Sequence, residues 1–334
     1  MPLIEVDGLS REFVVRRKAG RFRRTSHTVE AVKDLSFAVE RGEMVGYIGP
    51  NGAGKSTTIK MLTGILVPTA GGLSVAGIDP SRDRVGLTRR IGVVFGQRTT
   101  LWWDLPLRDS FDLLRKIYRV EPRRFRRNLA EFTELLDLGD LLDTPVRQLS
   151  LGQRMRGDIA AALLHDPDIL YLDEPTIGLD VVSKGRLRDF LRNVNAEREV
   201  TLLLTTHDLQ DIEQLCSRVM VIDHGSLVYD GTLTGLHARG SSTRTLVVDL
   251  VDETGPIDVP GATVRRVEGP RQWLSFPADA SAAPVVAAVA QRYAVADLSI
   301  DEPDIEDVIR QIYHAAPSRR SLSRSRSPAS DITR

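Results

Sequence analysis

Cysteine is almost absent from this chain, and long apolar runs and an excess of either charge are absent too. The single cysteine among 334 residues, Cys216, excludes an internal disulfide framework and favours a reducing compartment. No segment approaches the roughly 18 uninterrupted apolar residues that a membrane-spanning helix needs. The first residues lack the charged-then-apolar pattern of a secretion signal. We therefore expect a cytoplasmic protein whose membrane role must come through a partner.

Charge balances over the whole chain, with 45 Lys and Arg against 45 Asp and Glu, so no global field drives binding to nucleic acid or anionic membrane. The balance hides two local concentrations of arginine. One is a basic insert at 16–24, expected to form a loop or hairpin tip, and the other is an Arg- and Ser-rich tail at 316–334, expected to be disordered. Both segments could contact RNA or anionic lipid. The simpler interpretation is that they are solvent-exposed and bind no ligand.

Apolar segments separated by helical patterns predict an α/β protein with a parallel sheet covered on both faces. Residues 107–165 show apolar side chains at helical spacing. The expected strands lie at 3–15, 31–48, 91–95, 169–172, 200–205 and 219–222.

The composition changes near residue 240, and a small α+β module follows. Its expected strands and helices are 246–250, 262–265, 282–292 (helix), 294–300 and 305–313 (helix). We therefore divide the chain into a main domain at 1–240, with a helical subdomain at about 98–165, an accessory module at 243–315 and the tail.

A glycine-rich segment carries the most specific chemical signal in the chain. It follows the apolar residues 44–48, which predict a buried strand, and precedes residues 58–62, which predict a helix. Glycines let successive N–H groups turn toward an anion, and the helix N-terminus adds partial positive charge. This context favours a phosphate-binding loop of pattern G-x-x-x-x-G-K-[ST] over a glycine-rich turn with a solvated lysine. The loop consists of Gly49, Pro50, Asn51, Gly52, Ala53, Gly54, Lys55, Ser56 and Thr57.

Two adjacent carboxylates, Asp173 and Glu174, follow the apolar strand at 169–172. They face different ways at the carboxyl edge of the sheet, where ligands bind in open α/β folds. Asp173 and the Ser56 hydroxyl can hold Mg²⁺, and Lys55 supplies a charge for the outer phosphates. Glu174 can accept a proton from an attacking water. Two solvated carboxylates at a strand end are the alternative, which the phosphate loop makes weaker.

Three further signals gain meaning only as parts of a set. Ser150 and Gln153 form a capping-box pattern, and a helix start of this kind is also an anion site. Gln97 follows the strand at 91–95, and His207 follows the strand at 200–205. A lone glutamine or histidine in such a place carries no functional information.

The ordered set of motifs resembles the ATP-binding cassette (ABC) ATPases of membrane transporters, over about residues 3–235. The resemblance implies a P-loop NTPase fold with an ABC-type nucleotide-binding domain, ATP and Mg²⁺ as ligands, and hydrolysis of ATP to ADP and phosphate. It implies that the catalytic residues are Glu174, His207, Lys55 and Gln97, and that the metal-site residues are Ser56, Gln97 and Asp173. Beyond the phosphate loop, the implied nucleotide contacts are Phe13, Ser150, Gly152, Gln153 and Asp180.

The family pattern also implies particular roles. Gln97 senses Mg²⁺ and reports to the membrane partner, and His207 contacts the γ-phosphate. Phe13 occupies the place of the aromatic residue that stacks on adenine, and residues 178–180 cross the dimer interface. The basic insert separates Phe13 from the phosphate loop by more residues than usual, so adenine stacking could instead fall to Phe22.

Leu151 is a second departure, because it stands where the family signature has its central glycine. The backbone N–H remains, as do Ser150 and Gly152, so we expect the signature to work. In this family the signature of a second subunit closes over the ATP held by the first. The resemblance therefore implies a dimer, and an intact Glu174 and signature favour a homodimer with two competent sites.

The resemblance also implies a separate integral membrane permease and a location at the cytoplasmic face of the membrane. The permease is expected near Trp102 and Trp103, although packing of these side chains inside the helical subdomain is an equal alternative. Segments 95–98, 101–106, 149–156 and 297–308 are similar to the bacterial exporter branch of daunorubicin-resistance and viologen-exporter ATPases. The alternative function is a soluble ABC ATPase acting on ribosomes or nucleic acid, although no specific nucleic acid is expected.

Overall fold

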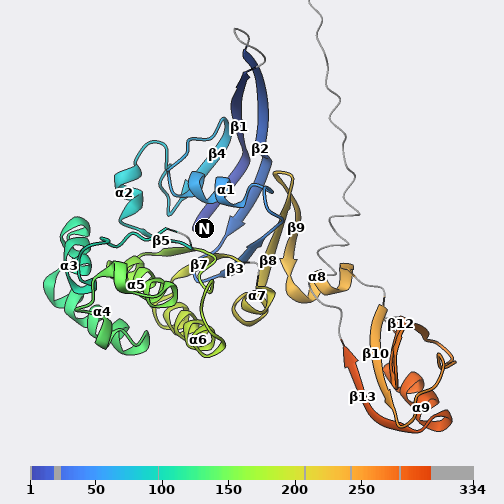
Figure 1. Ribbon diagram of the computed structural model, residues 1–334. Coiled ribbons are helices and arrows are strands. Elements are labelled where there is room, and N and C mark those ends of the chain that lie inside the picture. Colours follow the sequence, from blue (N-terminus) through green and yellow to red (C-terminus); the bar gives the residue numbers. More distant parts are fainter. Residues whose placement is uncertain are drawn as a thin grey trace, which may run out of the picture.

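The computed structural model describes residues 2–18, 24–96, 98–206, 208–240, 243–277 and 280–301 (Figure 1). Five sequence predictions lie outside the described residues: Phe22, Gln97, His207, the helix at 305–313 and the tail at 316–334. Within the described ranges, no helix is both long enough and apolar enough to cross a membrane.

A six-stranded sheet of order β5-β6-β7-β3-β8-β9 forms the centre of the molecule. Its first five strands pair in parallel, whereas β9 is antiparallel to β8. The parallel strands are mostly apolar along their length, because both of their faces are covered. The parallel sheet predicted from the sequence is confirmed, and the half-exposed β9 is an addition to it. The strands are β3 (Met44–Ile48), β5 (Ile91–Phe95), β6 (Ile169–Asp173), β7 (Thr201–Thr205), β8 (Arg218–Asp223) and β9 (Ser226–Thr232).

A second, antiparallel sheet has the order β2-β1-β4, with β1 (Ile4–Lys18), β2 (Arg24–Val39) and β4 (Ala70–Val75). One prediction was wrong here. Residues 31–48 are not one strand, because a turn at 40–43 sends β2 and β3 into different sheets. The ends of the basic insert belong to β1 and β2, because the strand register continues to the pair Lys18 and Arg24, and residues 19–23 lie outside the described residues. Figure 1 shows β1 and β2 projecting together as a long hairpin.

Helices cover the central sheet on both faces, and the strands of the sheet divide their side chains between two cores. In β6, Leu170 and Leu172 belong to the core beneath the helices that follow β5, whereas Ile169 and Tyr171 belong to the core shared with β1, β2 and α1. The helical prediction at 107–165 is confirmed. The helices are α1 (Lys55–Leu62), α2 (Arg84–Thr88), α3 (Leu107–Tyr118), α4 (Pro122–Leu135), α5 (Leu151–Leu163), α6 (Val181–Arg198), α7 (Leu209–Leu215) and α8 (Leu233–Gly240).

The C-terminal segment forms a four-stranded antiparallel sheet of order β11-β12-β10-β13, packed against one helix. It has its own core, in which Leu246 and Phe276 face Val289 of the helix. The predicted strands and helix at 246–300 are present, and β12 was missed. The elements are β10 (Thr243–Leu250), β11 (Thr263–Glu268), β12 (Arg271–Pro277), α9 (Ala282–Arg292) and β13 (Val295–Asp301).

Candidate nucleotide-binding site

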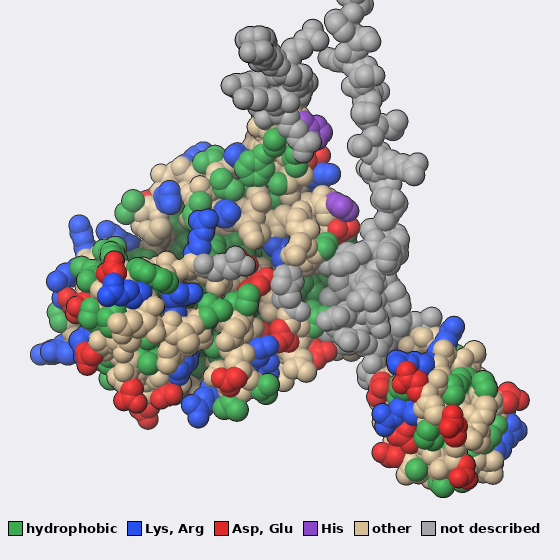
Figure 2. Space-filling model, in the orientation of Figure 1, with side chains coloured by type: hydrophobic (Ala, Val, Ile, Leu, Met, Phe, Trp, Pro, Cys, Tyr) green, Lys and Arg blue, Asp and Glu red, His purple; other side chains and the backbone are tan. Residues whose placement is uncertain are grey.

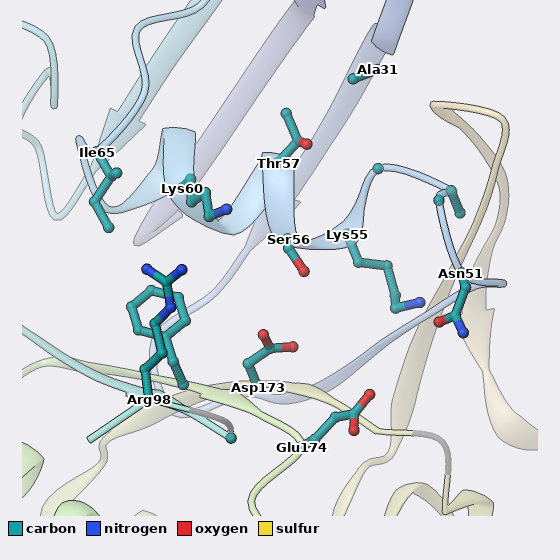
Figure 3. Close-up of a pocket in the computed structure, with 15 residues that line it drawn as sticks. Ala31, Asn51, Lys55, Ser56, Thr57, Lys60, Ile65, Arg98, Asp173 and Glu174 are labelled. Atoms are coloured by element: carbon teal, nitrogen blue, oxygen red, sulfur yellow. The ribbon is translucent and has the colours of Figure 1, made fainter. Parts of the chain in front are cut away.

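A cavity of about 500 Å³ lies at the carboxyl edge of the central sheet. The loop between β3 and α1 forms one wall, and the ends of β5 and β6 form the other. Figure 3 shows Lys55 and Ser56 on the first wall, facing Asp173 and Glu174 on the second. The structure therefore brings these four predicted site residues to one place.

The loop that lines the cavity depends on glycine at two positions. Gly54 has φ of 110°, and a Cβ there would lie 2.5 Å from the carbonyl oxygen of Ala31. Gly49 passes so close to β8 that a Cβ would lie 2.3 Å from the carbonyl oxygen of Ile222. Gly54 also begins α1 without a capping side chain, so the first N–H groups of this helix remain available to an anion.

Lys55 is held within the loop by its own backbone. Its ammonium group donates hydrogen bonds to the carbonyl oxygens of Gly49, at 2.5 Å, and Pro50, at 3.1 Å. Burial lowers the pKa of Lys55, and the Glu174 and Asp173 carboxylates oppose that shift. A phosphate entering the cavity would provide this half-buried cation with the negative charge that favours its protonated form.

The neighbouring strand β7 holds the Asp173 carboxylate and the Glu174 backbone. The Thr205 hydroxyl donates a hydrogen bond to Oδ1 of Asp173 at 2.5 Å, and the Glu174 N–H donates to the Thr205 carbonyl oxygen at 2.8 Å. Glu174 has φ of 54°, a left-handed conformation that costs a non-glycine residue about 1–3 kcal/mol. This backbone turn directs the Glu174 side chain into the cavity beside Asp173 (Figure 3).

Comparison with known proteins decides the family. Residues 32–177 match the family described as ABC transporter. The ABC transporter ATP-binding protein NatA of Bacillus subtilis is 33% identical over 217 residues, which are 65% of this chain and 88% of NatA. This chain belongs to the ABC transporter ATP-binding proteins.

Other ABC proteins resemble the chain over a similar length. The daunorubicin resistance ATP-binding protein DrrA3 of Streptomyces coeruleorubidus is 37% identical over 219 residues, covering 66% of this chain and 69% of DrrA3. Among solved structures, the ABC cassette MJ0796, described as a post-hydrolysis dimer bound to ADP and Pi, has a TM-score of 0.59 and 25% identity. It covers 69% of this chain and 98% of its own. The chain is thus an ABC ATPase, and the predicted P-loop NTPase fold is confirmed.

The predicted ABC signature, which begins at Ser150, lies at the start of α5. Its Ser150 and Gln153 form a capping box. The Gln153 N–H donates to the Ser150 hydroxyl at 3.2 Å, and the Ser150 N–H donates to Gln153 Oε1 at 2.9 Å. The capping-box prediction is therefore confirmed. Among the described residues that line the cavity, none comes from the signature. One chain alone therefore leaves Ser150, Gly152 and Gln153 away from the phosphate loop.

Leu151, the departure from the ABC signature, packs against the loop before α6. A Cβ on Gly178 would lie 2.4 Å from Cδ2 of Leu151, and a Cβ on Gly152 would lie 2.7 Å from Cδ2 of Leu179. Each leucine thus fills space that a glycine of the other loop leaves open. The following Asp180 caps α6, because its carboxylate accepts the Ser183 N–H at 2.9 Å, and this hydrogen bond lowers its pKa.

Three buried polar side chains lie behind the loop that follows Glu174, and no sequence motif pointed to them. The Thr176 hydroxyl donates to Oδ2 of Asp211 at 2.6 Å, and Arg188 Nε donates to Oδ1 of Asp211 at 2.8 Å. Asp211 is fully buried, and Arg188 is nearly so. The network ties the loop after Glu174 to α6 and α7. The one signal for this network in the sequence was Asp211, an acidic residue within the apolar pattern of the short helix α7.

The two aromatic predictions have different outcomes. Phe13 lies in β1 opposite Val29, with the Arg11 guanidinium 4.8 Å from its ring centroid. It is not among the described cavity-lining residues, and Phe22 lies outside the described residues. Trp102 and Trp103 are 38% and 50% exposed, so burial inside the helical subdomain, the alternative left open by the sequence, does not hold.

Proposed function

We propose that this ABC ATPase binds and hydrolyses ATP as one half of a dimer and thereby drives a separate membrane permease in export. The observation that carries the proposal is the meeting of Lys55, Ser56, Asp173 and Glu174 in one cavity, with the signature held outside it. Such an arrangement supplies phosphate-binding groups and a base. It does not supply the signature residues that would close over the γ-phosphate.

Each cavity residue takes a role that its position supports. The N–H groups of residues 49–57 and the Lys55 ammonium bind the phosphates, and they stabilise the charge that develops as the terminal phosphoryl bond breaks. Glu174 orients the attacking water and accepts its proton, because its carboxylate lies at the sheet edge facing the loop (Figure 3). By resemblance, His207 holds the γ-phosphate and Phe13 stacks on adenine.

Mg²⁺ is the metal that these residues fit. The Ser56 hydroxyl and the Asp173 carboxylate lie on facing walls of the cavity, and both are hard oxygen donors of the type that Mg²⁺ prefers. One Asp173 oxygen accepts the Thr205 hydroxyl, which fixes the orientation of the carboxylate. Gln97 joins this set by resemblance. Mg²⁺ held there would neutralise the negative charge of the phosphates.

A second copy of the chain supplies the signature that covers the nucleotide. Ser150, Gly152 and Gln153 of one copy face the nucleotide of the other, and the segment that ends at Asp180 crosses between the copies. Exposed Val181 and Val182, at 85% and 66%, follow this segment and provide apolar surface for the contact. Because each copy carries both the base and the signature, the homodimer has two complete sites.

The permease contact is assigned to the exposed tryptophans at the start of the helical subdomain. Paired, exposed aromatic side chains are typical of interface hot spots. A permease bound there would hold the ATPase at the cytoplasmic face of the membrane as a peripheral subunit. Relatives named for drug resistance and for Nod factor export favour an exporter. We also propose that the main domain ends at about residue 240, that the accessory module begins at 243, and that residues 98–165 form the helical subdomain.

The alternative, a soluble ABC ATPase on ribosomes or nucleic acid, has less support. On the face shown in Figure 2, basic and acidic side chains are interspersed. A nucleic-acid surface concentrates lysine and arginine on one face instead.

Two measurements test the proposal. Affinity purification from gently solubilised membranes is expected to yield a polytopic membrane protein in roughly equal amount. Ribosomal or nucleic-acid partners, with no membrane protein, would refute the transport assignment and leave the ATPase chemistry intact. For the chemistry, Glu174→Gln is expected to bind ATP, accumulate a closed dimer by size-exclusion chromatography and lose turnover roughly 100-fold or more. Turnover near wild type would exclude Glu174 as the base.

The permease contact has its own test once the permease is in hand. Trp102→Ala is expected to abolish stimulation of ATPase activity by the reconstituted permease while the ATPase activity of the isolated subunit persists. The exposed Ile117, 59% exposed on α3, provides an Ile117→Ala control that removes comparable apolar surface elsewhere in the helical subdomain. Unchanged stimulation in Trp102→Ala would exclude the contact.

A further inference from the structure

A buried carboxylate, Asp158, lies outside the nucleotide cavity and has no part in the chemistry proposed above. It lies in α5, the helix that begins at Ser150, and it is 6% exposed. A carboxylate is costly to bury unless it accepts hydrogen bonds. The partners of Asp158 therefore indicate what the residue is for.

Within the described residues, Asp158 accepts three hydrogen bonds from one short segment. Its Oδ1 accepts the Thr99 hydroxyl at 2.9 Å, the Thr100 N–H at 2.9 Å and the Thr100 hydroxyl at 3.1 Å. The Thr99 hydroxyl in turn accepts the Leu101 N–H at 3.1 Å. Burial raises the pKa of Asp158 despite these hydrogen bonds, so the carboxylate is retained against a desolvation cost. One side chain of α5 thus fixes the backbone directly after Gln97.

A second side chain of α5 holds the same segment. Arg154 lies one turn before Asp158 on the same helix face, and its guanidinium is 5.3 Å from the centroid of the Trp103 ring. Between them, Gly157 permits close packing, because a Cβ there would lie 3.0 Å from Leu107 and 3.2 Å from Leu101. Segment 99–103 is therefore attached to α5 by hydrogen bonds, a cation–π contact and apolar packing.

We propose that Asp158 is a positioning residue that makes α5 and segment 99–103 move as one unit. The proposal rests on the proposed function. At one end of the unit is Ser150, about 12 Å along the helix axis, which faces the nucleotide of the second subunit. At the other end are Trp102 and Trp103, which face the permease. Closure of the signature over ATP then displaces the tryptophans. When Asp158 is lost, the movement of the signature no longer reaches the tryptophans.

Tryptophan fluorescence gives a direct test, because the chain has three tryptophans and Trp273 lies in β12. In full-length protein carrying Trp273→Phe and Glu174→Gln, emission reports on Trp102 and Trp103 alone. ATP is expected to change this emission, and adding Asp158→Ala is expected to abolish the change while ATP still binds.

Steady-state kinetics on the otherwise native chain separate positioning from binding. Asp158→Ala is expected to lower kcat while the KM for ATP stays unchanged. Asp158→Asn keeps the oxygen acceptor and is expected to retain most of the turnover, because burial already favours a neutral group. In a double-mutant cycle, Thr100→Val should add little to Asp158→Ala, because both remove the same contact.

Asp143→Ala is the matched control, because this carboxylate forms an exposed ion pair with Arg108 in the same subdomain. It is expected to leave kcat and the fluorescence change intact. A normal fluorescence change in Asp158→Ala, or no change in the parent protein, would overturn the coupling. Loss of ATP binding together with turnover would also overturn it, because it shows a merely structural role. If purification yields no permease, the membrane assignment fails, and the fluorescence result still decides the coupling of α5 to segment 99–103.

Discussion

Removal of the Asp211 carboxylate is expected to destabilise the main domain strongly. Asp211 is fully buried in α7, and it binds Arg188 at 2.8 Å and the Thr176 hydroxyl at 2.6 Å. Asp211→Ala leaves the Arg188 guanidinium buried without its counter-charge, although Gln214 Oε1 still accepts one of its N–H groups at 2.9 Å. Breaking a buried pair in this way costs about 3–5 kcal/mol.

The expected shift can be measured as a melting temperature. For a domain of 150–250 residues, each kcal/mol lowers Tm by roughly 2–4 °C, so Asp211→Ala should melt about 6–20 °C below wild type. Circular dichroism at 222 nm, with the ligand-free protein at one fixed concentration, provides the assay. Because Thr176 lies in the loop after Glu174, ATPase turnover measured well below the melting range should fall as well.

Two further variants decide whether charge burial is the cause. Asp189→Asn breaks an exposed pair with Arg192 on the same helix, α6, and should keep Tm within about 2 °C of wild type. The double variant Asp211→Leu, Arg188→Met removes both charges and should recover most of the loss. The reasoning is refuted if Asp211→Ala melts within about 2 °C of wild type, or if the double variant is no more stable than the single one.

Two other predictions follow from particular contacts. Burial lowers the pKa of His165, which stacks on Tyr118, to about 4. The unfolded state therefore binds the proton first, and stability falls by about 3 kcal/mol as pH drops from 6.5 to 4; urea titrations of His165→Phe should show a correspondingly smaller loss. Gly178→Ala combines a φ of 73° with a clash against Leu151, so it should lower Tm and turnover. Adding Leu151→Gly should recover part of both losses, because it removes the clash and leaves the positive φ; no recovery would show that the contact is unimportant.

The phosphate loop was predictable because its chemistry is local. Residues 49–57 connect a strand and a helix that follow from their own apolar patterns, and a loop of this kind offers its backbone N–H groups to an anion. The capping box of Ser150 and Gln153 is local for the same reason. The pairing of Asp173 with the loop followed from a general rule, that parallel strands bring their carboxyl ends to one edge.

The errors and omissions occurred where long-range packing overrides local pattern. The segment at 31–48 alternates throughout, yet Gly42, with φ of 76°, allows the turn that sends its two halves into different sheets. Strands β4, β9 and β12 have mixed burial, so their periodicity is weak. The basic insert has the composition of a loop or hairpin tip, and how far the strands extend into it, to Lys18 and Arg24, depends on antiparallel pairing.

The sequence by itself determined the α/β fold and the ABC family, and it singled out Lys55, Ser56, Asp173 and Glu174 as candidate site residues, because short contiguous segments encode those features. Tertiary structure decided how the site is supported. Asp158 meets Thr100 across 58 residues, and Arg188 meets Asp211 across 23. The tertiary structure also placed Glu174 at a positive φ and packed Leu151 on Gly178. Such contacts depend on which helices and loops become neighbours, and the burial that makes them strong exists only once the whole domain has folded.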